Sequence, residues 1–303
     1  MTENSPFHSG EIEVQRLVGD VELAARVGSI IENKIPDIAH HFISQQSIIW
    51  LGAEAWGERP GAIPLFGSPG FIHVSDEETL EIDLCDAYSF SNIWSDVFVE
   101  GKNVGGLMIE LSTRRRFRIN GVVRSCTSDR LQIAVTQTYP NCPKYIRRRE
   151  FFGSLEPGEF KLLGNGQHIT QKVEDIIKRS DTAFVASSGP NGMDVSHRGG
   201  VAGFIHCIGK NKIMVPDYPG NHMFNTLGNF KVNPFGGMTI IDFSQSFFLQ
   251  LTGKIELIIN QEILHMPSGG EDRYWLMHIT DWSIFQLLND AGWEHLEYSP
   301  FNP

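Results

Sequence analysis

The segment from residue 194 to residue 230 concentrates side chains suited to binding an anion. It reads DVSHRGGVAGFIHCIGKNKIMVPDYPGNHMFNTLGNF and places Ser196, His197 and Arg198 next to one another. An arginine offers five donors in a fixed fork, and a serine hydroxyl adds one more, so this pair suits a phosphate group. Two glycines follow directly, and they allow a ligand to approach the backbone closely.

The pattern of this segment predicts a strand, a turn, two further strands and a short helix. Alternate side chains of a strand share a face, so Ser196 and Arg198 should point one way and His197 the other. A serine and a histidine that point apart make a poor nucleophile and base pair, and no hydrolytic dyad is expected. Asn221 is placed to cap the helix, whose free N–H groups would face an anion. The expected buried stripe of that helix comprises Met223, Phe224, Leu227 and Phe230.

The composition is that of an ordinary globular protein with an acidic balance. The chain has 303 residues and a formal net charge of -11, and this length suggests about two domains. The negative charge argues against nucleic acid or an anionic membrane as the main partner. No long apolar run and no apolar leader is present, and the four cysteines are scattered without metal-ligand spacing. A cytoplasmic protein with reduced thiols, no metal site and a small-molecule ligand is expected.

The sequence repeats internally. The tetrapeptide GFIH at 70–73 recurs at 203–206, an offset of 133 residues (203 − 70), and the flanking segments align with small gaps. Each half shows a run of short apolar strands bounded by turns, which predicts a barrel of about six strands. We therefore expect a mostly β fold with flanking helices (α+β), in which two barrels pack as an internal pseudo-dimer. The expected domains are residues 1–150 and 151–303.

The two halves differ at the candidate phosphate strand. In the first half, the positions that match Asp194, Ser196, His197 and Arg198 hold, in order, Gly61, Ile63, Pro64 and Leu65. That strand is apolar, and its proline cannot donate to a sheet ladder. The first half instead offers YPNCPKYIRRR at 139–149, which is either a loop that closes over an anionic planar ligand or a domain linker with a solvated basic end.

Several motifs together resemble the flavin-binding split-barrel proteins related to pyridoxamine 5′-phosphate oxidase. They are DVSHRGG, VPDYPGN and MFNTLGN, with the opening FHSGEIEVQRLVG, NCPKYI at 141–146 and the terminal YSPFNP pointing to a two-barrel subgroup. The resemblance covers nearly the whole chain. It implies tandem split β-barrels with FMN at the interface between them.

The resemblance also implies the cofactor-binding residues. Those on the phosphate side would be Ser196, His197, Arg198 and Gly199. Those along the ring and ribityl chain would be Pro216, Asp217, Gly220 and Asn221, and the helix would add Phe224, Asn225 and Thr226. Gln250 and Thr252 are further candidates because the matching family strand faces the interface. The first barrel would contribute Asn141, Lys144 and Tyr145.

The implied function is that of an FMN-dependent oxidoreductase acting on a small molecule, with NAD(P)H or another small electron donor. No catalytic side chain is required, because the flavin itself accepts hydride or electrons. The C-terminal DAGWEHLEYSPFNP lacks the substrate-phosphate arginines and histidine of a vitamin B6 oxidase, so that reaction is not expected. A flavin carrier or sensor, or a relative that uses haem or deazaflavin F420, are the alternatives. The chain would be a monomer with an internal pseudo-dimer, or a homodimer.

Purely structural interpretations, with no ligand, stay open for individual residues. Arg198 is alternatively a surface charge at a strand end, and His197 a hydrogen-bonded structural group. The arginine runs 114–116 and 147–149 are expected to be solvated or paired within the chain, since an acidic protein offers no basic surface for nucleic acid.

Overall fold

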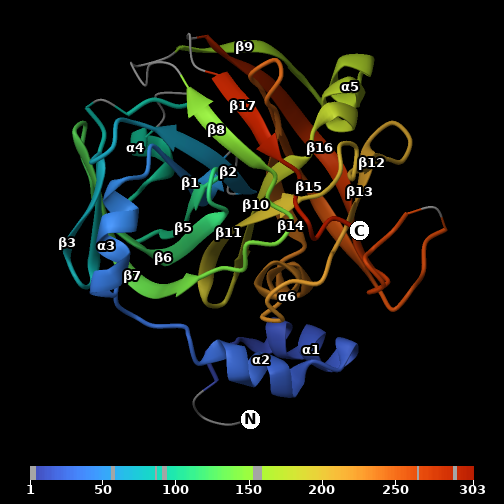
Figure 1. Cartoon of the computed structure of the whole chain (residues 1–303), viewed down its shortest axis with the longest axis horizontal. Coiled ribbons are helices and arrows are strands. Elements are labelled where there is room, and N and C mark those ends of the chain that lie inside the picture. The colour runs from blue at the N-terminus through green and yellow to red at the C-terminus, as the bar shows by residue number, and fades with distance from the viewer. Residues whose placement is uncertain are drawn as a thin grey trace.

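A computed structural model describes the chain over the ranges 5–55, 59–85, 87–90, 94–152, 159–264, 266–288 and 292–303. Within these ranges the protein is mostly β, with antiparallel sheets and few helices. This confirms the expected β-rich class. In Figure 1 the sheets occupy the body of the molecule, and the two N-terminal helices lie together at one end.

The first sheet is built from the first half of the chain. Its seven strands follow the order β2-β1-β5-β6-β7-β4-β3. Their bounds are β1 Ile48–Ala55, β2 Arg59–Phe66, β3 Ile72–Asp76, β4 Thr79–Asp83, β5 Asn103–Glu110, β6 Arg115–Cys126 and β7 Arg130–Pro140.

The second sheet copies this topology. Its order is β11-β10-β14-β15-β16-β13-β12, and one further strand, β9, pairs with β16. The bounds are β9 Glu159–Gly166, β10 Thr182–Gly189, β11 Gly192–Gly199, β12 His206–Cys207, β13 Lys212–Pro216, β14 Phe235–Asp242, β15 Phe247–Ile259 and β16 Arg273–Leu288. Strand for strand the two orders match, as the sequence repeat suggests. The closure of each sheet into a split barrel and the division at residue 150 stay predictions.

The halves pack about a pseudo-two-fold axis. Strand β11 at the edge of the second sheet lies against β5 and β6, and its copy β2 lies against β14 and β15. Trp50 and Phe184 hold equivalent positions, opposite Pro64 and His197 in their hairpins, and their rings stack at 3.7 Å. The axis therefore passes through this aromatic pair.

Two equivalent glycines permit the close contact between halves. A Cβ on Gly105 would lie 2.6 Å from the Met193 carbonyl oxygen, and a Cβ on its copy Gly237 would lie 2.0 Å from that of Pro60. Neither distance is sterically possible, so both positions require glycine for the edge strand of the other half to pack.

A small sheet and six helices complete the described structure. Strands β8 Arg148–Phe152 and β17 Gly292–Glu297 pair with each other. The helices are α1 Ser9–Val18, α2 Val21–Gly28, α3 Asp37–Ser44, α4 Trp94–Val97, α5 Gln171–Arg179 and α6 Asn225–Val232. Helix α1 packs on α6, which brings the N-terminal segment to the back of the candidate phosphate strand.

The expectation that Asn221 caps the helix was wrong. Helix α6 begins at Asn225, and the preceding residues His222 and Phe224 both have φ of 63°. These left-handed conformations interrupt a helix, so Asn221 instead accepts a 3.2 Å hydrogen bond from the Met223 N–H in a turn. Of the expected stripe, Phe224 is half-buried and the other three side chains are buried.

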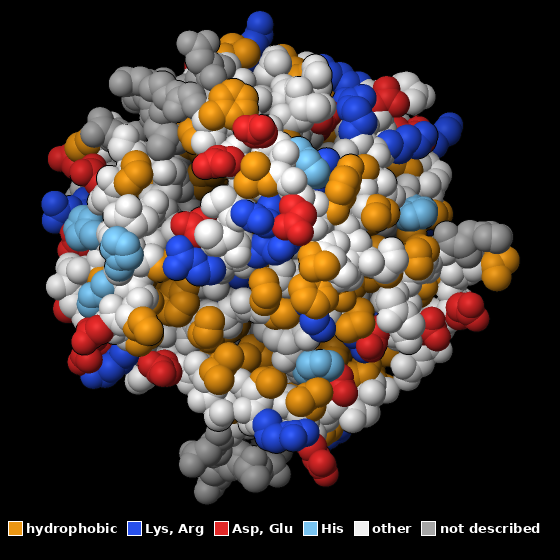
Figure 2. Space-filling view, in the orientation of Figure 1, with side chains coloured by type: hydrophobic (Ala, Val, Ile, Leu, Met, Phe, Trp, Pro, Cys, Tyr) orange, Lys and Arg blue, Asp and Glu red, His pale blue; other side chains and the backbone are white. Residues whose placement is uncertain are grey.

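The surface mixes charges of both signs. Figure 2 shows acidic and basic side chains interspersed on one face, with apolar side chains between them. Across the described ranges, no helix is both long and apolar enough to cross a bilayer.

Candidate functional site

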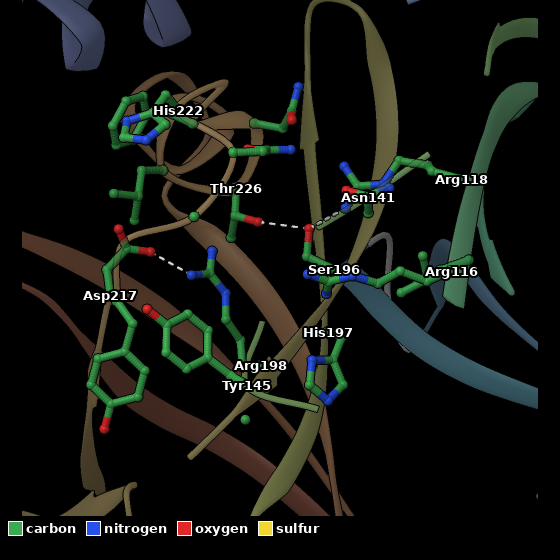
Figure 3. A pocket seen from close by; sticks show the side chains of 18 of the residues that line it. Arg116, Arg118, Asn141, Tyr145, Ser196, His197, Arg198, Asp217, His222 and Thr226 are labelled. Atoms are coloured by element: carbon green, nitrogen blue, oxygen red, sulfur yellow. Dashed lines mark hydrogen bonds and ion pairs between the residues drawn. The ribbon is translucent and has the colours of Figure 1, made fainter. Parts of the chain in front are cut away.

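A cavity of about 110 Å³ lies where β11 and α6 of the second half meet β6 of the first (Figure 3). Thirteen of the sixteen residues expected at the cofactor line it. They are Asn141, Tyr145, Ser196, His197, Arg198, Gly199, Pro216, Asp217, Gly220, Asn221, Phe224, Asn225 and Thr226. Residues separated by more than 80 positions in the sequence thus share one cavity.

The remaining three expected residues do not line this cavity. Lys144 is half-buried elsewhere in the loop, and Gln250 and Thr252 line a different cavity of about 490 Å³ beside Trp282. The reason is the pseudo-two-fold packing, because β15 faces β2, whereas β11 faces β6. The interface strand that meets the phosphate strand therefore comes from the other half.

Two arginines on β6, Arg116 and Arg118, line the cavity, whereas Gln250 and Thr252 do not. Arg118 pairs across from Leu107 as Gln250 does from Thr239, so the two are copies at an offset of 132 residues (250 − 118). Arg116 lies two positions before Arg118 and also lines the cavity. Sequence reasoning placed Arg116 in a solvated run and did not single out Arg118. Alignment of the two interface strands would have found Arg118, the copy of Gln250, but not Arg116, whose copy is Phe248.

Arg118 anchors a buried network. Its side chain is 4% exposed, and Nη1 donates to Asp194 at 3.0 Å and to the Tyr139 hydroxyl at 2.8 Å. Nη2 donates to the Ser196 hydroxyl, which in turn lies 3.0 Å from that of Thr226 on α6. The network fixes the direction of the Ser196 hydroxyl and ties the two halves together.

Asp194 is balanced by several donors. Besides Arg118, its carboxylate accepts from Asn120 at 2.7 Å and from Asn229 at 2.8 Å. A carboxylate with three donors is well satisfied although it is buried. The Arg118 charge is thus compensated within the protein.

The other two arginines leave positive charge in the cavity. Arg198 forms an ion pair with Asp217, which also accepts from Arg273 at 3.2 Å. Arg116 donates to the Cys142 carbonyl oxygen at 2.6 Å and, among the described residues, has no carboxylate partner. Burial, with Arg118 and Arg198 close by, lowers the pKa of Arg116 to about 10. An anion in the cavity would relieve this repulsion.

The start of α6 adds neutral donors. Asn225, Thr226 and Leu227, the first residues of the helix, line the cavity. The first N–H groups of a helix have no partner within it, and the helix dipole favours an anion there. The Asn225 amide is held from behind by Glu11, whose carboxyl oxygen accepts its N–H at 2.6 Å.

His197 is a packing group at the rear of the cavity. It is 7% exposed, and its ring meets Phe184 edge-on at 5.6 Å between centroids. Burial first, and then the charges of Arg116 and Arg198, hold its pKa well below the usual range. The imidazole is therefore neutral and contributes no charge to anion binding.

The loop at 141–146 reaches across from the first half. Tyr145 has a φ of 63°, and its hydroxyl donates to the Pro219 carbonyl at 3.0 Å. Its own carbonyl oxygen would lie 2.1 Å from a Cβ at residue 199, so Gly199 is required for the loop to lie against β11. This loop closes one side of the cavity.

The other arginines of the two runs are paired, as expected. Arg114 and Arg148 bind Glu297, Arg115 binds Glu110, and Arg147 and Arg149 share Asp181. Arg116 differs because it alone turns into the cavity.

Comparison with known proteins gives limited similarity. No protein-family model and no curated protein matches the sequence. Among solved structures, HupZ of Group A Streptococcus is 12% identical, covers 43% of this chain and 98% of its own, and has a TM-score of 0.29. A Lactobacillus delbrueckii protein, provisionally described as a pyridoxamine 5′-phosphate oxidase, is 10% identical, with coverage of 40% and 98% and a TM-score of 0.33. Such low similarity does not establish a shared fold.

Proposed function

We propose that the chain binds FMN in the cavity between β6, β11 and α6 and acts as an FMN-dependent oxidoreductase on a small molecule. One observation carries this proposal. Three arginines line the cavity, and the only carboxylate in its described lining is Asp217. Asp217 pairs with Arg198 and Asp194 pairs with Arg118, so Arg116 is left as excess positive charge, which favours an anion such as a phosphate ester.

The residues fit the phosphate end of the cofactor. Nε of Arg118, Nε of Arg198 and Nε2 of His197 are buried and have no hydrogen-bond partner among the described residues. The two arginine nitrogens are donors, and buried donors without partners are costly, so a ligand that accepts from them would be favoured. The Thr226 hydroxyl donates to the Ser196 oxygen, which leaves the Ser196 hydroxyl free to donate at the same place.

The ring end of the cofactor would need more room. A volume of about 110 Å³ holds a phosphate group, whereas pockets that enclose a whole ligand of this size measure ~300 Å³ or more. Tyr145 closes the cavity through the hydrogen bond from its hydroxyl to the Pro219 carbonyl. The Tyr218 ring packs on the Tyr145 ring at 5.0 Å between centroids. We expect the Tyr145 side chain to swing away when the flavin ring enters.

A bound flavin would supply the hydride or electron transfer. The chain would supply position and electrostatics: Arg116 and Arg198 hold the phosphate, Ser196 orients it, and the half-buried Phe224 shields the ring from water.

The proposal is tested by titration of the purified protein with FMN. A saturable change in flavin absorbance and fluorescence is expected, and bleaching by NAD(P)H under anaerobic conditions would distinguish the enzyme from a carrier or sensor. A protein that ignores FMN, or that shows a haem Soret band or binds F420 instead, would contradict it.

A further inference from the structure

A second cavity lies on the pseudo-two-fold axis. It measures about 150 Å³, and its described lining shares no residue with that of the arginine-lined cavity between β6, β11 and α6. Three pairs of equivalent side chains face it from the two halves: Trp50 and Phe184, Ile109 and Ile241, and Leu111 and Phe243. The duplication of the fold thus creates an aromatic and aliphatic chamber where the two copies meet.

The small sheet of β8 and β17 covers one side of this chamber. Phe151 and Trp293 pair across the sheet with ring centroids 4.9 Å apart, and both line the cavity. Trp293 also meets Phe243 edge-on at 5.2 Å. An apolar cavity of about 150 Å³ is large enough for a single benzene ring.

Six polar side chains interrupt the apolar lining, and two of them, Glu110 and Arg149, are charged. Arg149 on β8 lines the cavity although it is only 6% exposed. Its Nη2 donates to both oxygens of Asp181 at 2.8 and 2.6 Å, and its guanidinium lies 4.0 Å from the centre of the Phe243 ring. Its Nη1 is buried without a hydrogen-bond partner among the described residues. A cation with one unpaired donor therefore lies at the wall of the cavity.

The charge around Arg149 does not balance. Asp181 also accepts from Arg147 at 2.6 Å, so two guanidinium groups share one carboxylate and leave one positive charge. Glu110, the acidic residue of the described lining, is paired with Arg115 at 2.8 Å. Burial lowers the pKa of Arg149 in spite of Asp181, which is the sign of a cation that lacks sufficient compensation.

We propose that this cavity is a second binding site and that it takes a small aromatic carboxylate. The ring would lie among the aromatic side chains around Trp50 and Phe184, where offset and edge-on contacts are favourable. The carboxylate would accept from Nη1 of Arg149 and neutralise the excess charge of the Arg147, Arg149 and Asp181 cluster. The site is independent of FMN. The Phe184 ring lies between it and His197 of the arginine-lined cavity.

Calorimetric titration of the full chain with benzoate tests this site. We expect one benzoate per chain, with benzyl alcohol, the neutral analogue of similar shape, binding at least tenfold more weakly. Arg149→Gln removes the cationic donor and should weaken benzoate at least tenfold. Ile241→Phe fills the chamber from the opposite half and should abolish binding without removing any charge.

The matched control is Arg116→Ala, which removes a cation from the other cavity and should leave benzoate binding unchanged. Absence of saturable benzoate binding by the wild-type chain would overturn the proposal. Unchanged benzoate binding in Arg149→Gln would also overturn it, whether or not Ile241→Phe binds. Loss of benzoate binding in Arg116→Ala would overturn it as well. If Arg149→Gln fails to fold, Ile241→Phe and the benzyl alcohol comparison still decide the question. FMN binding is measured separately, so either site can fail without the other.

Discussion

Two equivalent interfaces in this protein have the same arrangement of strands, but one is charged and the other is uncharged at the equivalent positions. Where β11 meets β6, Arg198 and Arg118 face each other across a polar cavity. Where β2 meets β15, the equivalent residues are Leu65, which is fully buried, and Gln250. The duplicated fold therefore preserves the packing of edge strand on sheet, while only one copy keeps the charges that an anion requires.

The absence of a charge at Leu65 and the absence of a charge at Gln250 are physically linked. A buried cation without a counter-ion is strongly unfavourable, so an arginine on β15 would be costly once β2 had become apolar. Gln250 is a neutral group at that position, and its Nε2 has no partner among the described residues. The second interface thus lacks a charge at both equivalent positions, which predicts a single anion site in each chain.

The largest effect is expected when the charged interface loses its anchor. Arg118→Ala leaves Asp194 buried without its cation and should lower the free energy of unfolding by about 3–5 kcal/mol. The equivalent change Gln250→Ala removes a neutral group and should cost about 1 kcal/mol. Urea unfolding of both variants measures the difference, and equal losses would show that the two interfaces are not energetically distinct.

A smaller effect is expected on ligand affinity. Arg198→Ala removes charge-assisted hydrogen bonds worth about 1.5 to 3 kcal/mol each, so FMN should bind at least roughly tenfold more weakly. Arg115→Ala removes an exposed arginine of β6 that pairs with Glu110, and it should leave the affinity unchanged. Fluorescence titration compares them, and wild-type affinity in Arg198→Ala would place the phosphate elsewhere.

Per pH unit, the smallest effect concerns the helix that backs the charged interface. Burial, and then the charge of Asp194, raises the pKa of Glu11 to about 8 from its ordinary value of 4.5. Because the folded pKa is raised, the stability that this group contributes is complete below pH 4.5 and is lost as the pH rises to about 8. Relative to Glu11→Gln, the wild type should lose at most about 1.4 kcal/mol per pH unit in this window.

The control for this measurement is Glu13→Gln on the same helix. The Glu13 side chain is about half exposed and pairs with Lys231, so its substitution should cause far less drift with pH. Urea unfolding at several pH values gives the comparison. A constant difference between wild type and Glu11→Gln would mean that Glu11 is ionised throughout.

Much of the fold could be predicted from the sequence, because its signals are local. Short apolar runs bounded by turns predicted the strands, and the GFIH repeat predicted two halves of one strand order. DVSHRGG and PGNHMFNT predicted residues that do line one cavity, because these segments form β11 and the start of α6 in the second half. The reversal at Asn221 could not be foreseen, because nothing in the local pattern reveals left-handed residues at His222 and Phe224.

The part of the site that sequence reasoning missed depends on how the halves meet. Arg116 and Arg118 lie about 80 residues before Ser196, and the pattern around them is that of an ordinary strand. Only the pseudo-two-fold packing decides that β6, and not β15, faces β11. The same packing explains why Gln250 and Thr252 line a different cavity from most of the other expected residues.

The stoichiometry of FMN binding tests the central claim most directly. Calorimetric titration should give one FMN per chain, with affinity reduced at least tenfold in Arg116→Ala and unchanged in Gln250→Ala. Two FMN per chain, no binding at all, or equal affinity in Arg116→Ala and the wild type would contradict the account.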